Sequence, residues 1–132
     1  MPAETQTGTI SKTALWTGYI MSALPALMLL MSGVMKFMPL NEDAVKGLEH
    51  IGWSSNLVAA LGIVELVCVL LYILPRTAVL GAILLTGYLG GAIATHVRVG
   101  DVFLIQAILG MLLWGGLYLR DPRLRALIPW RK

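Results

Sequence analysis

The sequence predicts an all-α protein, an integral membrane bundle of four helices with both termini in the cytoplasm. Three observations predict this fold. The 132 residues are 58% hydrophobic and only 13% charged, whereas a soluble domain is about half apolar and about a quarter charged. Four apolar stretches are each long enough to cross a bilayer core, which takes about 20 helical residues. Finally, the basic residues gather on the side of the membrane that holds both ends.

Turn residues separate the apolar stretches, and none of the stretches shows the alternating polarity of a transmembrane β-strand. We expect a single domain over residues 1–132, with almost no chain left over for a soluble part. Its segments are spans at about 14–38, 56–74, 77–97 and 102–119, an outer loop at 39–55, and a basic cytoplasmic tail at 120–132.

The distribution of basic residues predicts the orientation of the chain. Seven fall on the side of the termini and three on the opposite side. The seven are Lys12, Arg76, Arg120, Arg123, Arg125, Arg131 and Lys132, and the three are Lys36, Lys46 and Arg98. Because cytoplasmic loops carry the excess of Lys and Arg, both termini are expected in the cytoplasm and the protein in the cell's inner membrane. The basic tail is typical of contact with anionic membrane lipid rather than with nucleic acid.

The outer loop has the pattern of a short amphipathic helix. Asn41 or Asp43 is a suitable N-cap residue. Val45, Leu48 and Ile51 then fall on one apolar side of the helix. We expect this helix to lie in the membrane interface over the outer mouth of the bundle.

Small residues recur at a spacing of four in the third span, at Gly87, Gly91 and Thr95. Small side chains at this spacing let helix backbones approach closely. We expect Gly87 and Gly91 to pack inside the bundle, with a homodimer face as the alternative.

Each span also carries a polar residue in the outer half of the membrane, where such groups are costly unless they face a partner or a cavity. The four are Lys36, Glu65, His96 and Gln106. Glu65 lies close to the midplane, nine residues into its span and so about 13 Å from the outer end. The sequence therefore predicts a polar cavity that opens outward and is closed on the cytoplasmic side.

Glu65 and His96 are the candidate catalytic groups of this cavity, since carboxylates and imidazoles serve as general acids and bases. The candidate ligand-binding residues are Lys36, Tyr88, Arg98 and Gln106. A purely structural ion pair is the open alternative, because the long side chain of Lys36 can reach inward to Glu65. The single cysteine, Cys68, excludes an intramolecular disulfide and a CxxC pair, and no metal site is predicted.

The order and spacing of several short motifs resemble the DoxX family of small membrane proteins. The motifs are Ser32-Gly33-x-x-Lys36-Phe37, Gly62-x-x-Glu65 with Leu74-Pro75, Gly81-Ala82, and Gly90-Gly91-Ala92-x-x-x-His96-x-Arg98-x-Gly100-Asp101. The last of these looks like the third helix of the DoxX-like branch. The resemblance covers about residues 14–120 and implies a four-helix membrane bundle. Its shared polar positions are Lys36, Glu65, His96 and Arg98.

The resemblance also implies redox chemistry, because the family is named after a membrane subunit of a thiosulfate:quinone oxidoreductase. Other relatives are linked to quinone detoxification or oxidative-stress complexes. The expected function is therefore a quinone-associated redox subunit that binds a lipophilic ligand in the outer half of the bundle. It would hold no covalent cofactor, so an electron carrier would have to be bound, as a quinone could be, or supplied by a redox partner protein. Two alternatives stay open: a cofactor-free membrane enzyme acting on a lipophilic substrate, and a non-catalytic assembly subunit.

Overall fold

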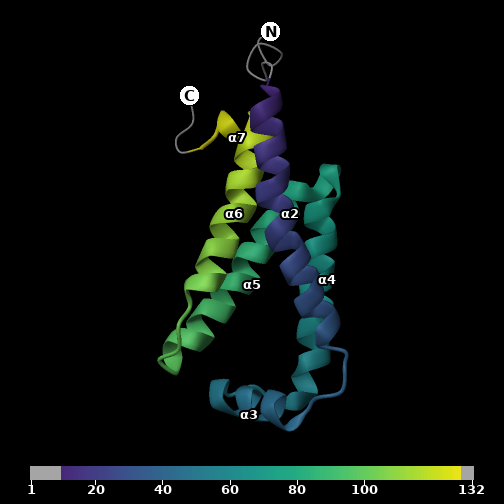
Figure 1. Ribbon diagram of the computed structural model, residues 1–132, viewed down its shortest axis with the longest axis vertical. Coiled ribbons are helices and arrows are strands. Elements are labelled where there is room, and N and C mark those ends of the chain that lie inside the picture. Colours follow the sequence, from purple (N-terminus) through teal and green to yellow (C-terminus); the bar gives the residue numbers. More distant parts are fainter. Residues whose placement is uncertain (1–9, 129–132) are drawn as a thin grey trace.

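The computed structural model describes residues 10–128, and this part of the chain is helical with no strand (Figure 1). The first nine residues and the predicted tail residues Arg131 and Lys132 lie outside the described part. The elements in chain order are α2 (Lys12–Met35), α3 (Glu42–Ile51), the 3-10 helix η1 (Ser55–Leu57), α4 (Val58–Ile73), the 3-10 helix η2 (Pro75–Thr77), α5 (Ala78–Arg98), α6 (Leu104–Arg120) and α7 (Pro122–Arg125).

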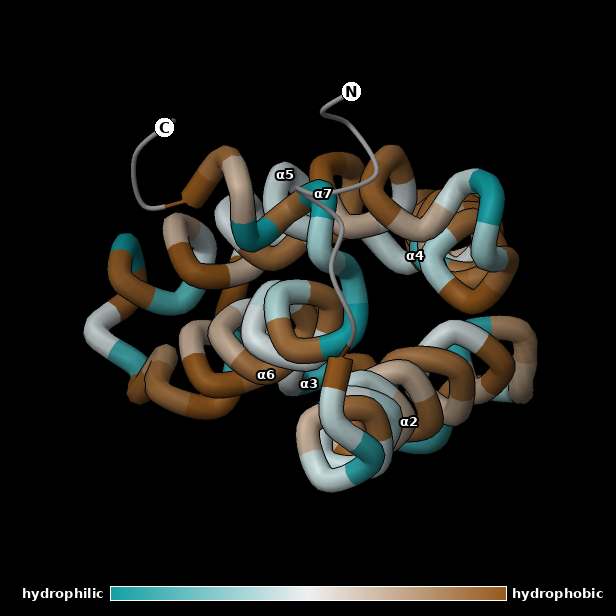
Figure 2. Tube along the Cα trace, turned by 90° about the horizontal axis from the view of Figure 1, so that it is seen from above, coloured by the Kyte–Doolittle hydropathy of each residue, from teal (hydrophilic) through white to brown (hydrophobic). Residues whose placement is uncertain are grey.

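Three helical stretches are long and apolar enough to cross a membrane: Lys12–Met35, Ser55–Ile73 and Pro75–Arg98. Helix α6 is also apolar but shorter, with 17 residues. Within an apolar window of 18 residues in each of these stretches, only 33%, 33% and 28% of the residues are buried inside the protein. Hydrophobic positions lie on outward-facing as well as inward-facing turns of the helices (Figure 2). A helix that is apolar all round requires an apolar environment on its outer faces, and the fold is that of a membrane helical bundle.

The four long helices form a ring in which each packs against two neighbours. Helix α2 packs on α4 and α6, and α5 packs on the same two helices from the other side. The residues at the centre are almost completely buried, and they are Val69, Tyr72, Leu85, Leu113 and Leu117.

Helix α2 changes its main neighbour along its length. Near its start, a Cβ atom added to Gly18 would lie 2.8 Å from the carbonyl oxygen of Gly116 on α6. Near its end, a Cβ atom added to Gly33 would lie 2.7 Å from the side chain of Leu66 on α4. Pro25, which removes one backbone hydrogen bond from the helix, is buried between these two contacts. As a result α2 runs obliquely across the bundle (Figure 1).

The close approach of α4 and α5 depends on Gly81, which lies outside the four-residue spacing of Gly87, Gly91 and Thr95. A Cβ atom added to Gly81 would overlap the backbone of Tyr72. By contrast, Cβ atoms added to Gly87 and Gly91 would meet no atom within 4 Å. The expectation that Gly87 and Gly91 pack inside the bundle is wrong, because both lie on an exposed face of α5. The motif alone does not specify which side of an apolar helix faces its neighbours.

Helix α3 extends across the end of the bundle where α5 and α6 meet (Figure 1). As expected, the Asn41 side chain caps the helix by accepting a hydrogen bond from the Ala44 amide at 2.8 Å. The helix ends at Gly52, whose φ of 85° is the left-handed conformation that glycine adopts most readily. Arg98 donates to the carbonyl oxygen of Ile51 at 2.6 Å and so ties this end of α3 to α5.

Candidate functional site

The carboxylate of Glu65 on α4 is the centre of a polar cluster contributed by three helices. Its side chain is only 1% exposed. Lys36, the residue that directly follows α2, forms an ion pair with Glu65 Oε2 at 2.9 Å. The hydroxyl groups of Tyr88 on α5 and Ser32 on α2 donate to the same oxygen at 3.2 Å and 3.4 Å. The predicted residues Lys36, Glu65 and Tyr88 are therefore in direct contact.

The local sequence explains why this cluster forms at the crossing of α2 and α4. Ser32 and Lys36 are one helical turn apart, so both project from the same face of α2. Gly62 on α4 faces that turn, and a Cβ atom added to it would lie 3.0 Å from Lys36 Cβ. Gly33 occupies the corresponding position on α2. These glycines bring the two backbones close enough for a lysine on one helix to reach a carboxylate on the other.

The hydrogen bonds of the cluster are distributed unevenly over the carboxylate. All three bonds that Glu65 accepts from described residues end on Oε2, and none ends on Oε1. Lys36 donates to Ser32 Oγ and to Glu65 Oε2, both at 2.9 Å. An ammonium group has three donors, so one remains. The cluster thus holds a free acceptor and a free donor beside a lysine side chain that is 24% exposed.

Three other predicted site residues do not join this cluster. His96 Nδ1 lies 2.7 Å from the carbonyl oxygen of Ala92 in its own helix. Arg98 bonds the end of α3. Gln106 has a buried Oε1 without a partner among the described residues. No hydrogen bond or ion pair between residues 10 and 128 joins any of the three to Glu65.

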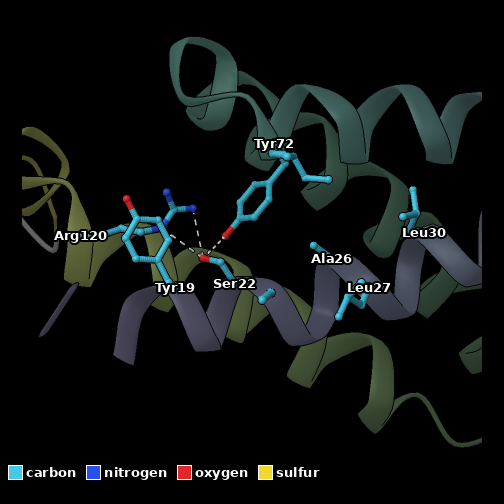
Figure 3. Close-up of a pocket in the computed structure, with 9 residues that line it drawn as sticks. Tyr19, Ser22, Ala26, Leu27, Leu30, Tyr72 and Arg120 are labelled. Atoms are coloured by element: carbon cyan, nitrogen blue, oxygen red, sulfur yellow. Dashed lines mark hydrogen bonds between the residues drawn. The ribbon is translucent and has the colours of Figure 1, made fainter. Parts of the chain in front are cut away.

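A second polar cluster, which the sequence did not predict, lies at Ser22 in the N-terminal half of α2 (Figure 3). The Tyr72 hydroxyl group is 2.7 Å from Ser22 Oγ and 2.6 Å from the carbonyl oxygen of Leu113. Arg120 donates to Ser22 Oγ from Nε at 3.3 Å and from a terminal nitrogen at 3.2 Å. The Leu113 carbonyl oxygen can only accept, so the Tyr72 hydroxyl group donates its proton there. Ser22 Oγ accepts from Arg120 and has its own proton left for the bond with the Tyr72 oxygen.

This second cluster borders a cavity of about 320 Å³. The lining residues come from α2, α4 and α6, and they are Tyr19, Ser22, Ala23, Ala26, Leu27, Leu30, Tyr72, Ile73 and Arg120. Tyr19, Tyr72 and Arg120 lie near the ends of apolar spans, where aromatic and basic residues ordinarily serve as interfacial anchors. Their sequence pattern therefore does not indicate that they line a cavity. The one usable signal is Ser22, the only hydroxyl group in the apolar stretch at residues 20–31.

The part of the chain that the structure describes contains no group of three or more His, Cys, Asp or Glu side chains suited to a metal ion. Cys68 is a free thiol buried in the core.

The model of a family described as DoxX-like matches residues 20–116, which include both polar clusters except Tyr19 and Arg120. No curated protein matches the chain, and no solved structure matches it.

Proposed function

Because the chain belongs to the DoxX-like family, we propose that it is a membrane subunit of a redox system that binds a quinone at Glu65. In this proposal the chain crosses the membrane four times, with both termini in the cytoplasm. Helix α6 serves as the fourth span, since its 17 residues reach the lower end of the range of about 17–25 for transmembrane helices. Helix α3 lies in the outer interface, with Val45, Leu48 and Ile51 half-buried.

The unused hydrogen-bonding groups at Glu65 carry the proposal. A quinone ring has two carbonyl oxygens, and the hydroquinone has two hydroxyl groups. The free donor of Lys36 suits a carbonyl oxygen, and Oε1 of Glu65 suits a hydroxyl group. A carboxylate that accepts hydrogen bonds on only one oxygen can also accept a proton on the other. The quinone itself supplies the electron chemistry, and a redox partner protein exchanges electrons with it.

The position of the cluster also suits a lipophilic ligand. Lys36 lies at the end of α2, next to side chains that are exposed on the lipid-facing surface, such as Met35 and Phe37. A ligand dissolved in the bilayer therefore reaches the polar groups without crossing water. The acid–base enzyme is less well supported, because His96 bonds its own helix and makes no contact with Glu65.

Titration of the purified protein in lipid nanodiscs with decylubiquinone tests the proposal. Glu65→Gln removes the anionic acceptor, and Tyr88→Phe removes only one hydroxyl group from the same carboxylate. Glu49→Gln, an exposed carboxylate on α3, is the matched control. We expect Glu65→Gln to weaken binding by about tenfold or more, as the loss of a charge-assisted hydrogen bond does, and Glu49→Gln to leave it unchanged.

The melting temperature is measured on the same samples. If Glu65→Gln lowers the melting temperature but binds decylubiquinone as tightly as the unmodified protein, the cluster is structural and the proposal fails. It fails equally if the unmodified protein, shown to be folded, does not bind decylubiquinone.

A further inference from the structure

We propose that the cavity at Arg120 is a binding site for an anionic phospholipid, with its phosphate on the Arg120 guanidinium and part of an acyl chain between α2 and α4. This site is separate from the Glu65 cluster. Ser22 and Ser32 stand ten residues apart on α2, which corresponds to about 15 Å along the helix. The inference therefore does not rest on the proposed quinone site.

The charge of Arg120 is the first reason. No carboxylate lies within ion-pair distance of its guanidinium among residues 10–128. The adjacent Asp121 instead pairs with Arg123 at 3.5 Å. Arg120 is half-buried, and a partly desolvated cation without a counter-ion is costly. An anion from the surroundings removes that cost.

The geometry of the guanidinium is the second reason. Its central carbon lies 5.1 Å from the ring centre of Tyr19 and 5.8 Å from that of Tyr72. Nε and one terminal nitrogen donate to Ser22 Oγ. Of the five N–H groups of an arginine, three remain, and a guanidinium fork matches two phosphate oxygens at once. Figure 3 shows Arg120 and Tyr72 converging on Ser22, so the guanidinium group of Arg120 is held in place before a ligand binds.

The shape and lining of the cavity are the third reason. Apart from Arg120, Ser22 and the two tyrosines, every lining residue is aliphatic. Ala23 and Ala26 line the α2 side of the cavity with small side chains that leave room for a ligand. Leu27 and Ile73 are 59% and 52% exposed on the outer surface. The cavity therefore opens sideways, toward the space that membrane lipid fills. A volume of about 320 Å³ is at the lower end of small-molecule pockets, about 300–1,000 Å³, and suits one segment of an acyl chain.

The height of the site in the membrane agrees with a phospholipid headgroup. Arg120 is the last residue of α6, and Arg123 and Arg125 follow on α7. Arg125 is engaged with the carbonyl oxygens of Tyr118 and Leu119 at 2.8 Å and 2.6 Å, whereas the Arg123 side chain is 80% exposed. A basic rim of this kind concentrates anionic lipid, and Arg120 combines the charge with a mainly apolar cavity.

Native mass spectrometry and lipid titration of the full chain in a neutral detergent test the site. The probes are dioleoyl phosphatidylglycerol, dioleoyl phosphatidylcholine and inorganic phosphate. Arg120→Gln removes the proposed ligand, and Arg123→Gln changes the net charge equally at an exposed position. We expect one phosphatidylglycerol to bind the unmodified protein, with a Kd that rises about tenfold or more in Arg120→Gln and stays within about twofold in Arg123→Gln.

A second variant tests the proposal independently, in case Arg120→Gln does not fold. Ala23→Leu narrows the cavity from an exposed position on α2 and keeps every charge. It should weaken phosphatidylglycerol binding as well, whereas Glu65→Gln should not. Equal losses in Arg120→Gln and Arg123→Gln would mean diffuse attraction and would overturn the proposal. Binding of phosphatidylcholine or inorganic phosphate as tight as that of phosphatidylglycerol would overturn it too.

Discussion

Lys36 and Glu65 form an ion pair in which the two partners differ sharply in exposure, since the side chain of Lys36 is 24% exposed and that of Glu65 is 1% exposed. The carboxylate thus depends on the protein for its charge balance, while the ammonium group can still meet a ligand or a headgroup. Lys36 also bonds Ser32, and Tyr88 bonds Glu65. The pair is therefore enclosed by the protein at Glu65 and accessible from outside at Lys36.

A double-mutant cycle on this pair gives the first prediction. Lys36→Met leaves the buried Glu65 carboxylate without its cation, and breaking such a pair costs about 3–5 kcal/mol of unfolding free energy. The double variant Lys36→Met/Glu65→Gln should recover most of that loss, because no uncompensated charge remains. Unfolding in mixed detergent micelles measures all of the variants. A double variant as unstable as Lys36→Met alone would contradict the interpretation of the pair.

The two kinds of glycine in α5 give the second prediction. Gly81→Ala places a methyl group against the Tyr72 backbone and should lower the unfolding free energy by about 1–3 kcal/mol, as overpacking does. Gly87→Ala meets open space and should be neutral or stabilising by up to about 1 kcal/mol, because alanine favours the helix. Thermal unfolding in detergent compares the two variants. A similar loss of stability in both would place Gly87 in a tight contact instead.

Removal of the Tyr72 hydroxyl group gives the third prediction. Tyr72 is 2% exposed and bonds both Ser22 and the Leu113 carbonyl. Tyr72→Phe leaves these buried groups short of a partner and should cost about 1–3 kcal/mol. Tyr19→Phe is the control, since Tyr19 is 56% exposed and its substitution should stay within about 0.5 kcal/mol. Chemical unfolding monitored by circular dichroism distinguishes them.

Helix α3 and its attachment to α5 give the fourth prediction. Arg98 donates to the last carbonyl group of α3, and His50 lies 3.0 Å from Asp101 on the following turn. Arg98→Gln should loosen this end of α3 and raise amide hydrogen exchange in residues 42–51 by about fivefold or more, since a hydrogen bond to a charged group contributes about 1.5–3 kcal/mol. Lys46→Gln, an exposed change on α3 itself, should leave exchange as it is.

The apolar stretches and the cap of α3 could be predicted because each depends on local sequence. Length and hydropathy set the positions of the helices to within a few residues, and Asn41 begins α3 as its side-chain chemistry suggests. The contact between Lys36 and Glu65 could also be predicted, because two opposite charges in apolar spans have few other partners. In these cases the residue type alone restricts the possible environments.

The direction in which each helix faces could not be predicted in the same way. In a water-soluble helix the polar face points outward, but here both faces of α5 are apolar and the pattern carries no such signal. The sequence therefore groups His96 and Gln106 with Glu65, although neither forms a hydrogen bond with it in the structure. The contact among Ser22, Tyr72 and Arg120 joins residues up to 98 positions apart, and only the packed bundle brings them together.

The unequal lengths of α2 and α6 have a consequence for the bilayer around a four-span protein. Helix α2, with 24 residues, is about 36 Å long, and α6, with 17 residues, is about 25 Å long. If α6 is the fourth span, as proposed above, a hydrocarbon layer of about 30 Å fits neither helix, and we expect α2 to tilt and the layer to thin beside α6. Arg120 at the end of α6 would then meet the headgroups where the layer is thinnest. The mismatch would thus give the membrane unequal thickness on the two flanks of the protein.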